Sequence, residues 1–269
     1  MLFRSPIMAL RQKPDASISV ATQLVKRGEA DAVISMGPTG TVMVSAMVTL
    51  GTLEGIKRPT VGGDVLGFVP ETLIFDLGAN VDCNPRELMS FAVMGCVVAK
   101  RMLHITNPTV ALLSNGAEEG KGNQSVKRAY QLFKMSDLNF IGSVEGDDIV
   151  DGKANVIICD GFTGNVLIKF CEGLSRSIIE RLRVTLDKRL SKTDIEAVCE
   201  DLFSLTNVID VRGGGLVYGI NGLVWTGHGR SKAPQVAKSI YQVKLAVESN
   251  LVESLKLGLR KMQELEEGD

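Results

Sequence analysis

The chain has 269 residues, of which 45% are hydrophobic and 23% are charged, and its formal net charge at pH 7 is −1. This composition is typical of a globular protein with a large core, and it excludes a disulfide-stapled miniature protein. A nearly neutral chain has no broad electrostatic attraction to nucleic acid, so nucleic-acid binding is not expected.

The cysteines and the N-terminus bear on the cellular compartment. Five cysteines, an odd number without a C-x-x-C pair, lie mostly in apolar runs and are interpreted as buried thiols of a cytoplasmic protein. Residues 1–13 contain three basic residues within a short apolar stretch, so no secretory signal is expected. The most apolar windows, 42–50 and 91–99, fall well short of the ~20 residues that a membrane span requires.

Helical and strand patterns alternate along the chain. A helix over 16–27 is predicted from apolar residues at helical spacing between Asp15, a possible N-cap, and Gly28. Short apolar runs predict strands at 32–35, 72–75, 110–113, 156–159 and 223–225. Further helices are predicted at 41–50, 85–102, 124–134, 164–190 and 233–266, the last without a strong stop signal. We therefore expect an α/β fold with a mostly parallel sheet and flanking helices, as a single domain over 1–269 with a helical protrusion around 174–210.

Four loops rich in small and amide residues each follow a predicted strand and precede a predicted helix. They are residues 35–40, 76–82, 115–123 and 160–165. Loops at the carboxyl ends of parallel strands deliver backbone N–H groups and helix N-termini to anions. In any single loop, turn geometry and helix capping account for the same residues. Four such loops at one sheet edge favour an anion-binding site.

Several common sites are not supported by the sequence. No Walker pattern is present, and no G-x-G-x-x-G follows a strand, so nucleotide binding is not expected. The only histidines are His104, interpreted as structural, and His228, for which a site role and a capping role are about equally supported. Acidic residues that could hold Mg²⁺ equally cap helices or orient a lysine, so no metal and no cofactor are predicted. Lys121, between two glycines, is a candidate point charge for a phosphate or an oxyanion.

Four segments together resemble the phosphate acyltransferases of bacterial phospholipid synthesis. They are residues 76–83 (DLGANVDC), 118–123 (EEGKGN), 144–146 (VEG) and 159–166 (CDGFTGNV). The resemblance extends from about residue 5 through the loop 227–229. Family members begin with a strand and a glycine-rich acidic turn that this sequence lacks, so it resembles a family chain shortened at its N-terminus. Pro38 stands where the family usually has Asn, residues 114–117 replace a more regular segment, and 213–219 is a loosened form of the family's glycine-rich turn.

The resemblance implies a fold similar to the isocitrate and isopropylmalate dehydrogenases and to the phosphotransacetylases, in a homodimer. It implies transfer of a fatty acyl group from acyl carrier protein to inorganic phosphate, which gives acyl-phosphate for phospholipid synthesis. For this reaction, donors are needed where the phosphate is held and where negative charge develops, and the candidate catalytic residues are Lys121, Asn165 and His228. The candidate residues that bind the phosphate or thioester are Gly37, Thr39, Gly40, Asn80, Asp82, Gly120, Gly122, Asn123, Thr163 and Gly164.

The predicted helix 164–190 offers a docking surface. Acyl carrier protein is acidic, and this region supplies the basic residues Arg176, Arg181, Arg183, Lys188, Arg189 and Lys192. Leucine and isoleucine also recur every four residues, at Leu174, Ile178, Leu182, Leu186 and Leu190. Core or dimer packing is one explanation of this stripe, and the resemblance adds reversible association with the inner face of the membrane.

Two other functions fit the same residues. A phosphate transacetylase that uses acyl-coenzyme A shares the phosphate handling and the fold. A truncated, non-catalytic paralogue that dimerises or binds acyl carrier protein fits the missing first strand. A dehydrogenase of the related fold is disfavoured because the sequence has no nucleotide fingerprint.

Overall fold

The computed structural model describes residue 13 and residues 15–267. The N-terminal segment for which no secretory signal is expected lies outside this range, apart from Lys13. The described helices are α2 (Ser17–Lys26), α3 (Thr39–Leu50), α4 (Pro85–Met102), α5 (Gln124–Lys134), α6 (Gly161–Leu186), α7 (Lys192–Thr206), α8 (Val208–Arg212), α9 (Ala233–Glu248) and α10 (Leu251–Glu267). The described strands are β1 (Ala32–Ser35), β2 (Thr60–Asp64), β3 (Leu73–Phe75), β4 (Val110–Leu113), β5 (Phe140–Val144), β6 (Val156–Ile158), β7 (Gly214–Tyr218) and β8 (Leu223–Gly227).

The strands form one mixed sheet in the order β1-β8-β7-β2-β3-β6-β4-β5. Two parallel groups, β1 with β8 and β3 with β6, β4 and β5, flank a central pair. In the centre β7 is antiparallel to both β8 and β2, and β2 is antiparallel to β3. The two parallel groups therefore run in opposite directions. The predicted α/β class with a mostly parallel sheet and flanking helices is confirmed.

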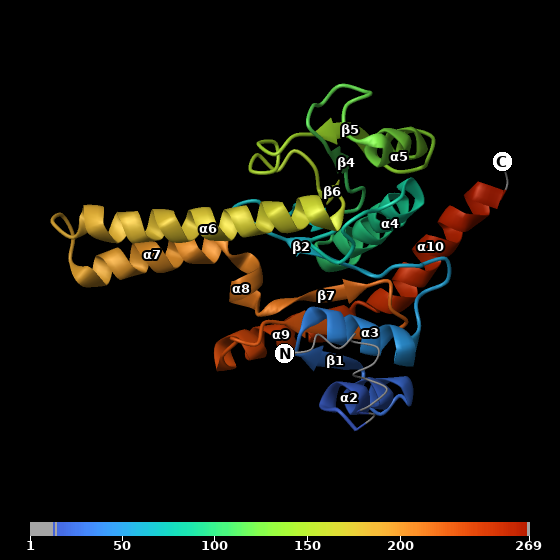
Figure 1. The fold of residues 1–269 in the computed structure, drawn as a ribbon, viewed down its shortest axis with the longest axis horizontal. Helices are drawn as coiled ribbons and strands as arrows, with labels where there is room; N and C mark the ends of the chain where they lie inside the picture. The colour runs from blue at the N-terminus through green and yellow to red at the C-terminus, as the bar shows by residue number, and fades with distance from the viewer. Residues whose placement is uncertain (1–12, 14, 268–269) are drawn as a thin grey trace.

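Helices cover both faces of the sheet (Figure 1). On one face, α4, α5, α9 and α10 pack on Leu73, Phe75, Leu216 and Tyr218 in the largest core cluster. On the other face, α2 and α3 cover the strands β1, β7 and β8, while α6 covers the strands from β3 to β4. The alternation of side chains along each strand divides the core between these two faces.

Helix α4 shows why some boundaries are predictable from sequence. Asn84 is its N-cap, and the Asn84 side chain accepts hydrogen bonds from the backbone N–H groups of Arg86 and Glu87, both at 3.0 Å. The Glu87 carboxylate in turn accepts from the Asn84 N–H at 2.9 Å, which completes a capping box, and Pro85 occupies the first helical position. The observed helix has the predicted limits.

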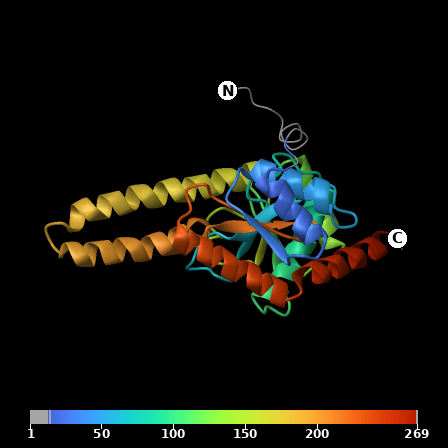
Figure 2. The same ribbon diagram turned by 90° about the horizontal axis from the view of Figure 1, so that it is seen from below.

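Helices α6 and α7 form an antiparallel hairpin that extends from the body of the molecule (Figure 2). Ile179 of α6 packs on Ile195 and Cys199 of α7, with Leu186 and Leu202 beside them. Arg183 of α6 also makes two hydrogen bonds to the Glu196 carboxylate of α7, at 2.9 and 2.8 Å. An apolar seam and an ion pair therefore hold the hairpin together.

Three predictions about the elements were wrong. The predicted helix 233–266 is two helices, because Asn250 adopts a left-handed conformation with φ of 52° that ends the first one. The predicted helix 164–190 begins earlier and ends at Leu186, and α7 follows as a separate helix. The glycine-rich turn expected at 213–219 contains the strand β7. Strands β2 and β5 were not predicted.

Candidate functional site

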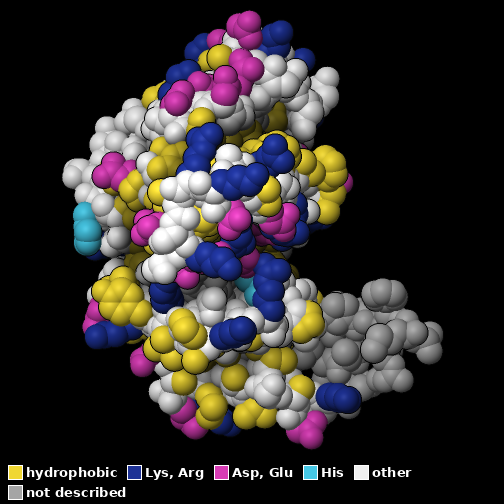
Figure 3. Space-filling view, turned by 90° about the vertical axis from the view of Figure 1, so that its left-hand side faces the viewer, with side chains coloured by type: hydrophobic (Ala, Val, Ile, Leu, Met, Phe, Trp, Pro, Cys, Tyr) yellow, Lys and Arg dark blue, Asp and Glu magenta, His cyan; other side chains and the backbone are white. Residues whose placement is uncertain are grey.

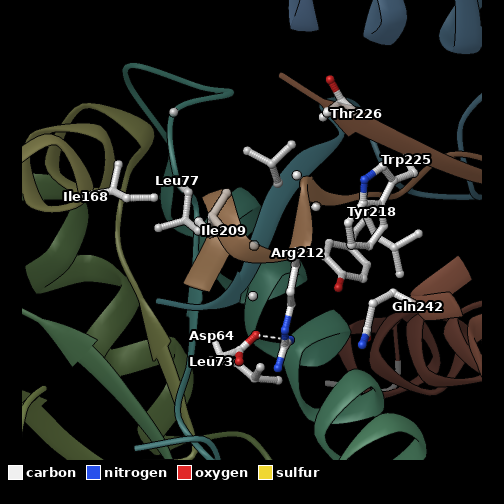
Figure 4. Close-up of a pocket in the computed structure, with 18 of the residues that line it drawn as sticks. Asp64, Leu73, Leu77, Ile168, Ile209, Arg212, Tyr218, Trp225, Thr226 and Gln242 are labelled. Atoms are coloured by element: carbon white, nitrogen blue, oxygen red, sulfur yellow. Dashed lines mark hydrogen bonds and ion pairs between the residues drawn. The ribbon is translucent and has the colours of Figure 1, made fainter. Parts of the chain in front are cut away.

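A cavity of about 490 Å³ lies where the central strands meet α6, α8 and α9. Figure 4 shows Leu77, Ile168 and Ile209 on one side of it, Tyr218, Trp225 and Gln242 on the other, and Arg212 between them. Its volume lies within the ~300–1,000 Å³ of small-molecule sites. This cavity is the candidate active site.

The turn after β3 is built around the buried carboxylate of Asp76. One carboxylate oxygen accepts from the N–H groups of Gly78 and Ala79, at 2.8 and 2.7 Å. The other accepts from the N–H and the side-chain amide of Asn80, at 3.0 and 2.7 Å. Burial raises the pKa of Asp76, and these hydrogen bonds offset that rise in part. Since Asn80 also donates to the carbonyl of Pro59 at 2.9 Å, its amide is engaged within the turn.

The N-terminus of α6 packs directly on this turn. Asp160 caps the helix by accepting from the Thr163 N–H at 2.7 Å. A Cβ atom at Gly164 would lie 1.8 Å from the carbonyl oxygen of Asp76, so no other residue fits this contact without movement of the helix. Gly161 and Gly164, both in the first turn of α6, therefore bring the positive end of the helix dipole to the Asp76 turn, and Asn165, the next residue, lines the cavity.

The end of β8 supplies another edge of the cavity. The hydroxyl of Thr226 donates to that of Thr39, at the start of α3, at 3.4 Å. His228 follows, with Nε2 buried, without a hydrogen-bond partner among the described residues, and 3.5 Å from the Asp210 carboxylate. Asp210 is held by Arg230 at 2.5 Å.

An ion pair between Asp64 and Arg212 crosses the middle of the cavity (Figure 4). Asp64 ends β2 and its side chain is only 7% exposed, whereas the Arg212 side chain, from α8, is 36% exposed. Burial raises the pKa of Asp64, and the neighbouring guanidinium lowers it in part. The pair places a partly exposed guanidinium, a good ligand for phosphate, at the centre of the site.

The predicted site residues divide into two sets. Thr39, Asn165 and His228 line the cavity, although they lie far apart in sequence. The following residues do not line it: Gly37, Gly40, Asn80, Asp82, Gly120, Lys121, Gly122, Asn123, Thr163 and Gly164. Asn123 is the N-cap of α5 and accepts from the Val126 N–H at 2.9 Å, so its side chain has a structural role. Lys121 is exposed.

The expectation of four loops at one sheet edge was wrong in part. The loops 76–82, 115–123 and 160–165 do follow the adjacent parallel strands β3, β4 and β6. The loop 35–40 follows β1, which runs in the opposite direction because antiparallel strands lie between the two groups. Thr39 meets Gly78 and Asn165 across the cavity and not along a shared rim.

Sequence analysis missed the central residues of the cavity. Asp64 and Arg212 are 148 positions apart, and neither lies in a loop with a recognisable pattern. The available signal was the glycine doublet Gly62-Gly63 before Asp64 and the glycine triplet 213–215 after Arg212. A glycine doublet in a strand marks a close approach of backbone or ligand.

No group of three or more His, Cys, Asp or Glu side chains within the part of the chain that the structure describes is arranged to bind a metal ion. None of the helices described is long and apolar enough to cross a membrane.

Comparison with solved structures places the fold. The chain is similar to a phosphotransacetylase from Streptococcus pyogenes, with a TM-score of 0.59 and 19% identity, over 86% of this chain and 66% of that one. It is also similar to a branched-chain phosphotransacylase from Enterococcus faecalis, with a TM-score of 0.53 and 16% identity, over 86% and 79% of the two chains. The chain thus spans slightly less than two thirds of the first structure. These likenesses confirm the predicted phosphotransacetylase-like fold.

Comparison of sequences identifies the family. A family model described as "Fatty acid synthesis protein" matches residues 3–254. A phosphate acyltransferase from Trichodesmium erythraeum is 40% identical over 260 residues, which are 94% of this chain and 76% of that protein. Another, from Desulforamulus reducens, is 39% identical over 97% of this chain and 79% of its own length. The chain therefore belongs to the phosphate acyltransferase family of enzymes.

Proposed function

We propose that this protein transfers a fatty acyl group from acyl carrier protein to inorganic phosphate, and that the acyl-phosphate serves phospholipid synthesis. The observation that carries the proposal is the cavity, which joins a partly exposed guanidinium and the Asn165 amide of α6 to an extensive apolar lining. Phosphate needs the first two features, and a fatty acyl thioester needs the third.

The reaction requires no covalent intermediate with the protein. A phosphate oxygen attacks the thioester carbonyl carbon and forms a tetrahedral oxyanion. The carbon–sulfur bond then breaks, the pantetheine leaves as a thiolate that takes up a proton, and acyl-phosphate remains. Arg212 holds the phosphate, while Asn165 and His228 donate hydrogen bonds where negative charge develops.

Variants of the candidate residues test whether the reaction takes place in the cavity or at the loop 118–123. Asn165→Ala and His228→Ala are each expected to lower kcat for acyl-phosphate formation by ~10²-fold, because each removes a donor from the site. Lys121→Ala is expected to have a smaller effect, since the exposed Lys121 does not line the cavity. The measurement is mass-spectrometric detection of acyl-phosphate from palmitoyl-acyl carrier protein and phosphate.

The same assay tests the other functions. Faster turnover with palmitoyl-coenzyme A than with the carrier protein would favour a transacetylase-like enzyme. Binding of acyl carrier protein without any acyl-phosphate would favour a non-catalytic paralogue. If Lys121→Ala lost more activity than the two cavity variants, the reaction would have to take place at the loop 118–123 and not in the cavity.

We also propose that the outer end of the hairpin receives acyl carrier protein. Between Arg181 and Lys192 the chain has five basic residues and one acidic residue, Asp187. Figure 3, which views the molecule from this end, shows lysine and arginine side chains across the middle of the face, with acidic side chains among them. Arg183 is paired with Glu196, so Arg181, Lys188 and Arg189 carry more of the proposed attraction.

The proposed homodimer and the reversible membrane association both concern the apolar residues of α6. Leu186 packs against α7 and Leu182 is half-buried, so the expected stripe is partly used inside the hairpin. Val184 and Leu190 near the outer end are 70% and 43% exposed, and Phe162 and Phe170 near the body are 63% and 64% exposed. We propose that Val184 and Leu190 contact the membrane surface, and that Phe162 and Phe170 lie in the dimer interface.

The double variant Val184→Glu, Leu190→Glu is expected to lower binding to anionic liposomes at least ~10-fold, because two carboxylates oppose insertion and repel the anionic surface. Sedimentation with vesicles measures this, and the molecular mass in solution should remain that of the unmodified protein. Phe170→Glu is the matched variant, expected to keep liposome binding and to weaken the dimer. Unchanged sedimentation of the double variant would contradict the assignment.

A further inference from the structure

The lining of the cavity belongs to both faces of the sheet. Asn165 and Ile168 of α6 and Ile209 of α8 contribute from one face. Val98 of α4 and Leu245 of α9 contribute from the other, where α4 and α9 pack on the largest core cluster. Figure 4 shows Ile168 and Ile209 on one side of Arg212, and Tyr218 and Gln242 on the other. The cavity therefore crosses the sheet.

The crossing is possible because β2 changes its partner. Thr60 and Val61 pair with β7, but from Gly62 to Asp64 the strand pairs with β3. The segment of β7 opposite this change begins with Gly214-Gly215 and pairs only with β8 among the described strands. An added Cβ atom would meet nothing within 4 Å at Gly63, and at Gly215 it would make an ordinary contact of 3.7 Å with the carbonyl oxygen of Gly62 in β2. A narrow gap bordered by bare backbone thus separates β7 from β2.

The part of the cavity beyond the gap is mainly apolar. Leu73, Val98, Met102, Leu103, Leu216 and Leu245 line it. The polar side chains on this face are Tyr218, Gln242 and Asp64, which is the cross-strand partner of Leu73 and is already paired with Arg212. Tyr218 and Gln242 alone are too few to satisfy the amides of a pantetheine arm. The hydrogen-bond donors of the proposed chemistry, Asn165 and His228, lie on the other side of the gap. A hydrocarbon chain fits the far part, with its thioester left at the near part.

We propose that the acyl tail of the substrate passes between β7 and β2 and is held on the far face of the sheet by α4 and α9. This proposal rests on the proposed function for its substrate, a fatty acyl thioester. Residues at the gap and at the far end, Gly215 and Leu245, then determine which chain lengths are accepted.

The first test compares palmitoyl and hexanoyl donors. Gly215→Leu fills the gap and Leu245→Phe shortens the far end, and each is expected to lower the ratio of kcat/KM for palmitoyl over hexanoyl transfer at least about tenfold. Ile240→Phe is the matched control, since Ile240 lies on α9, is 54% exposed and does not line the cavity. Far-ultraviolet circular dichroism shows whether each variant is folded. An unchanged ratio in folded Gly215→Leu and Leu245→Phe would overturn the proposal.

The second test does not depend on catalysis. Trp225, the only tryptophan of the chain, lines the cavity, so a palmitic acid that carries bromine in its tail should quench its fluorescence on contact. Saturable quenching is expected in the unmodified protein and in Ile240→Phe, and at least about tenfold weaker binding in Gly215→Leu. Quenching without acyl-phosphate formation would refute the proposed function and leave the channel standing. Acyl-phosphate formation without chain-length dependence or quenching would refute the channel alone.

Discussion

Gly164→Ala is expected to reduce acyl-phosphate formation below detection and to lower the free energy of unfolding by about 3 kcal/mol. The added methyl carbon would lie 1.8 Å from the carbonyl oxygen of Asp76, and a backbone atom cannot turn aside as a flexible side chain can. The first turn of α6 must therefore move away from the Asp76 turn. That movement displaces Asn165 from the cavity.

Gly173→Ala is the matched control in the same helix. A Cβ atom at Gly173 would meet nothing within 4 Å, so the substitution should be neutral or slightly stabilising, because alanine favours the helix more than glycine does. Thermal unfolding and the acyl-phosphate assay measure both variants. We expect the melting temperature of Gly164→Ala to fall by about 5–10 °C and that of Gly173→Ala to remain or rise. Equal behaviour of the two variants would show that the contact between α6 and the Asp76 turn is unimportant.

The elements that sequence analysis located well carry strong local signals. The strands at 110–113 and 32–35 are short apolar runs, and both were found at their observed limits. Helix α4 has its proline and capping box, and α5 has the Asn123 cap. In each case the residues that define the boundary lie within a few positions of it, so local physics is sufficient.

The central strands have no local sequence signal of a strand. Their glycines are needed instead where two backbones, distant in sequence, come close together. A Cβ at Gly214 would lie 2.0 Å from the carbonyl oxygen of Thr226, so the pairing of β7 with β8 requires a residue that is poor in strands by propensity. The break between α9 and α10 depends on a single left-handed residue, Asn250, in an otherwise helical pattern. From residue propensities alone, the glycines of β7 are predicted to form a turn, and the segment around Asn250 is predicted to continue as a helix.

The candidate site was predictable only where its residues lie in loops. Thr39, Asn165 and His228 follow strands in glycine-rich segments, and this pattern is enough to select them. The same pattern selected Asn80 and Asn123, which do not line the cavity, because an amide at a strand end caps a turn or helix as readily as it binds a ligand. The pairing of Asp64 with Arg212 arises from the direction of the two central strands, which local patterns do not determine.

Arg212→Met is expected to lower the free energy of unfolding at neutral pH by about 2 kcal/mol and to abolish detectable acyl-phosphate formation. Removal of one partner from a buried ion pair typically costs ~3–5 kcal/mol, because the other charge remains uncompensated. The smaller figure applies here because the Arg212 side chain is 36% exposed, so solvent already screens part of the interaction. Chemical denaturation and the acyl-phosphate assay measure the two effects.

The stability defect of Arg212→Met should depend on pH in a definite direction. Burial already raises the pKa of Asp64 in the folded protein, and loss of the guanidinium, which lowers it, must raise it further. The folded variant then retains a proton on Asp64 that the unfolded chain has lost, so its stability falls as the pH rises through the raised pKa. The deficit relative to the unmodified protein should therefore shrink between pH ~7 and pH ~5. Addition of Asp64→Asn removes the titrating group and should abolish this dependence while restoring much of the stability. A deficit that grows on acidification would show that Asp64 is not the group that Arg212 compensates.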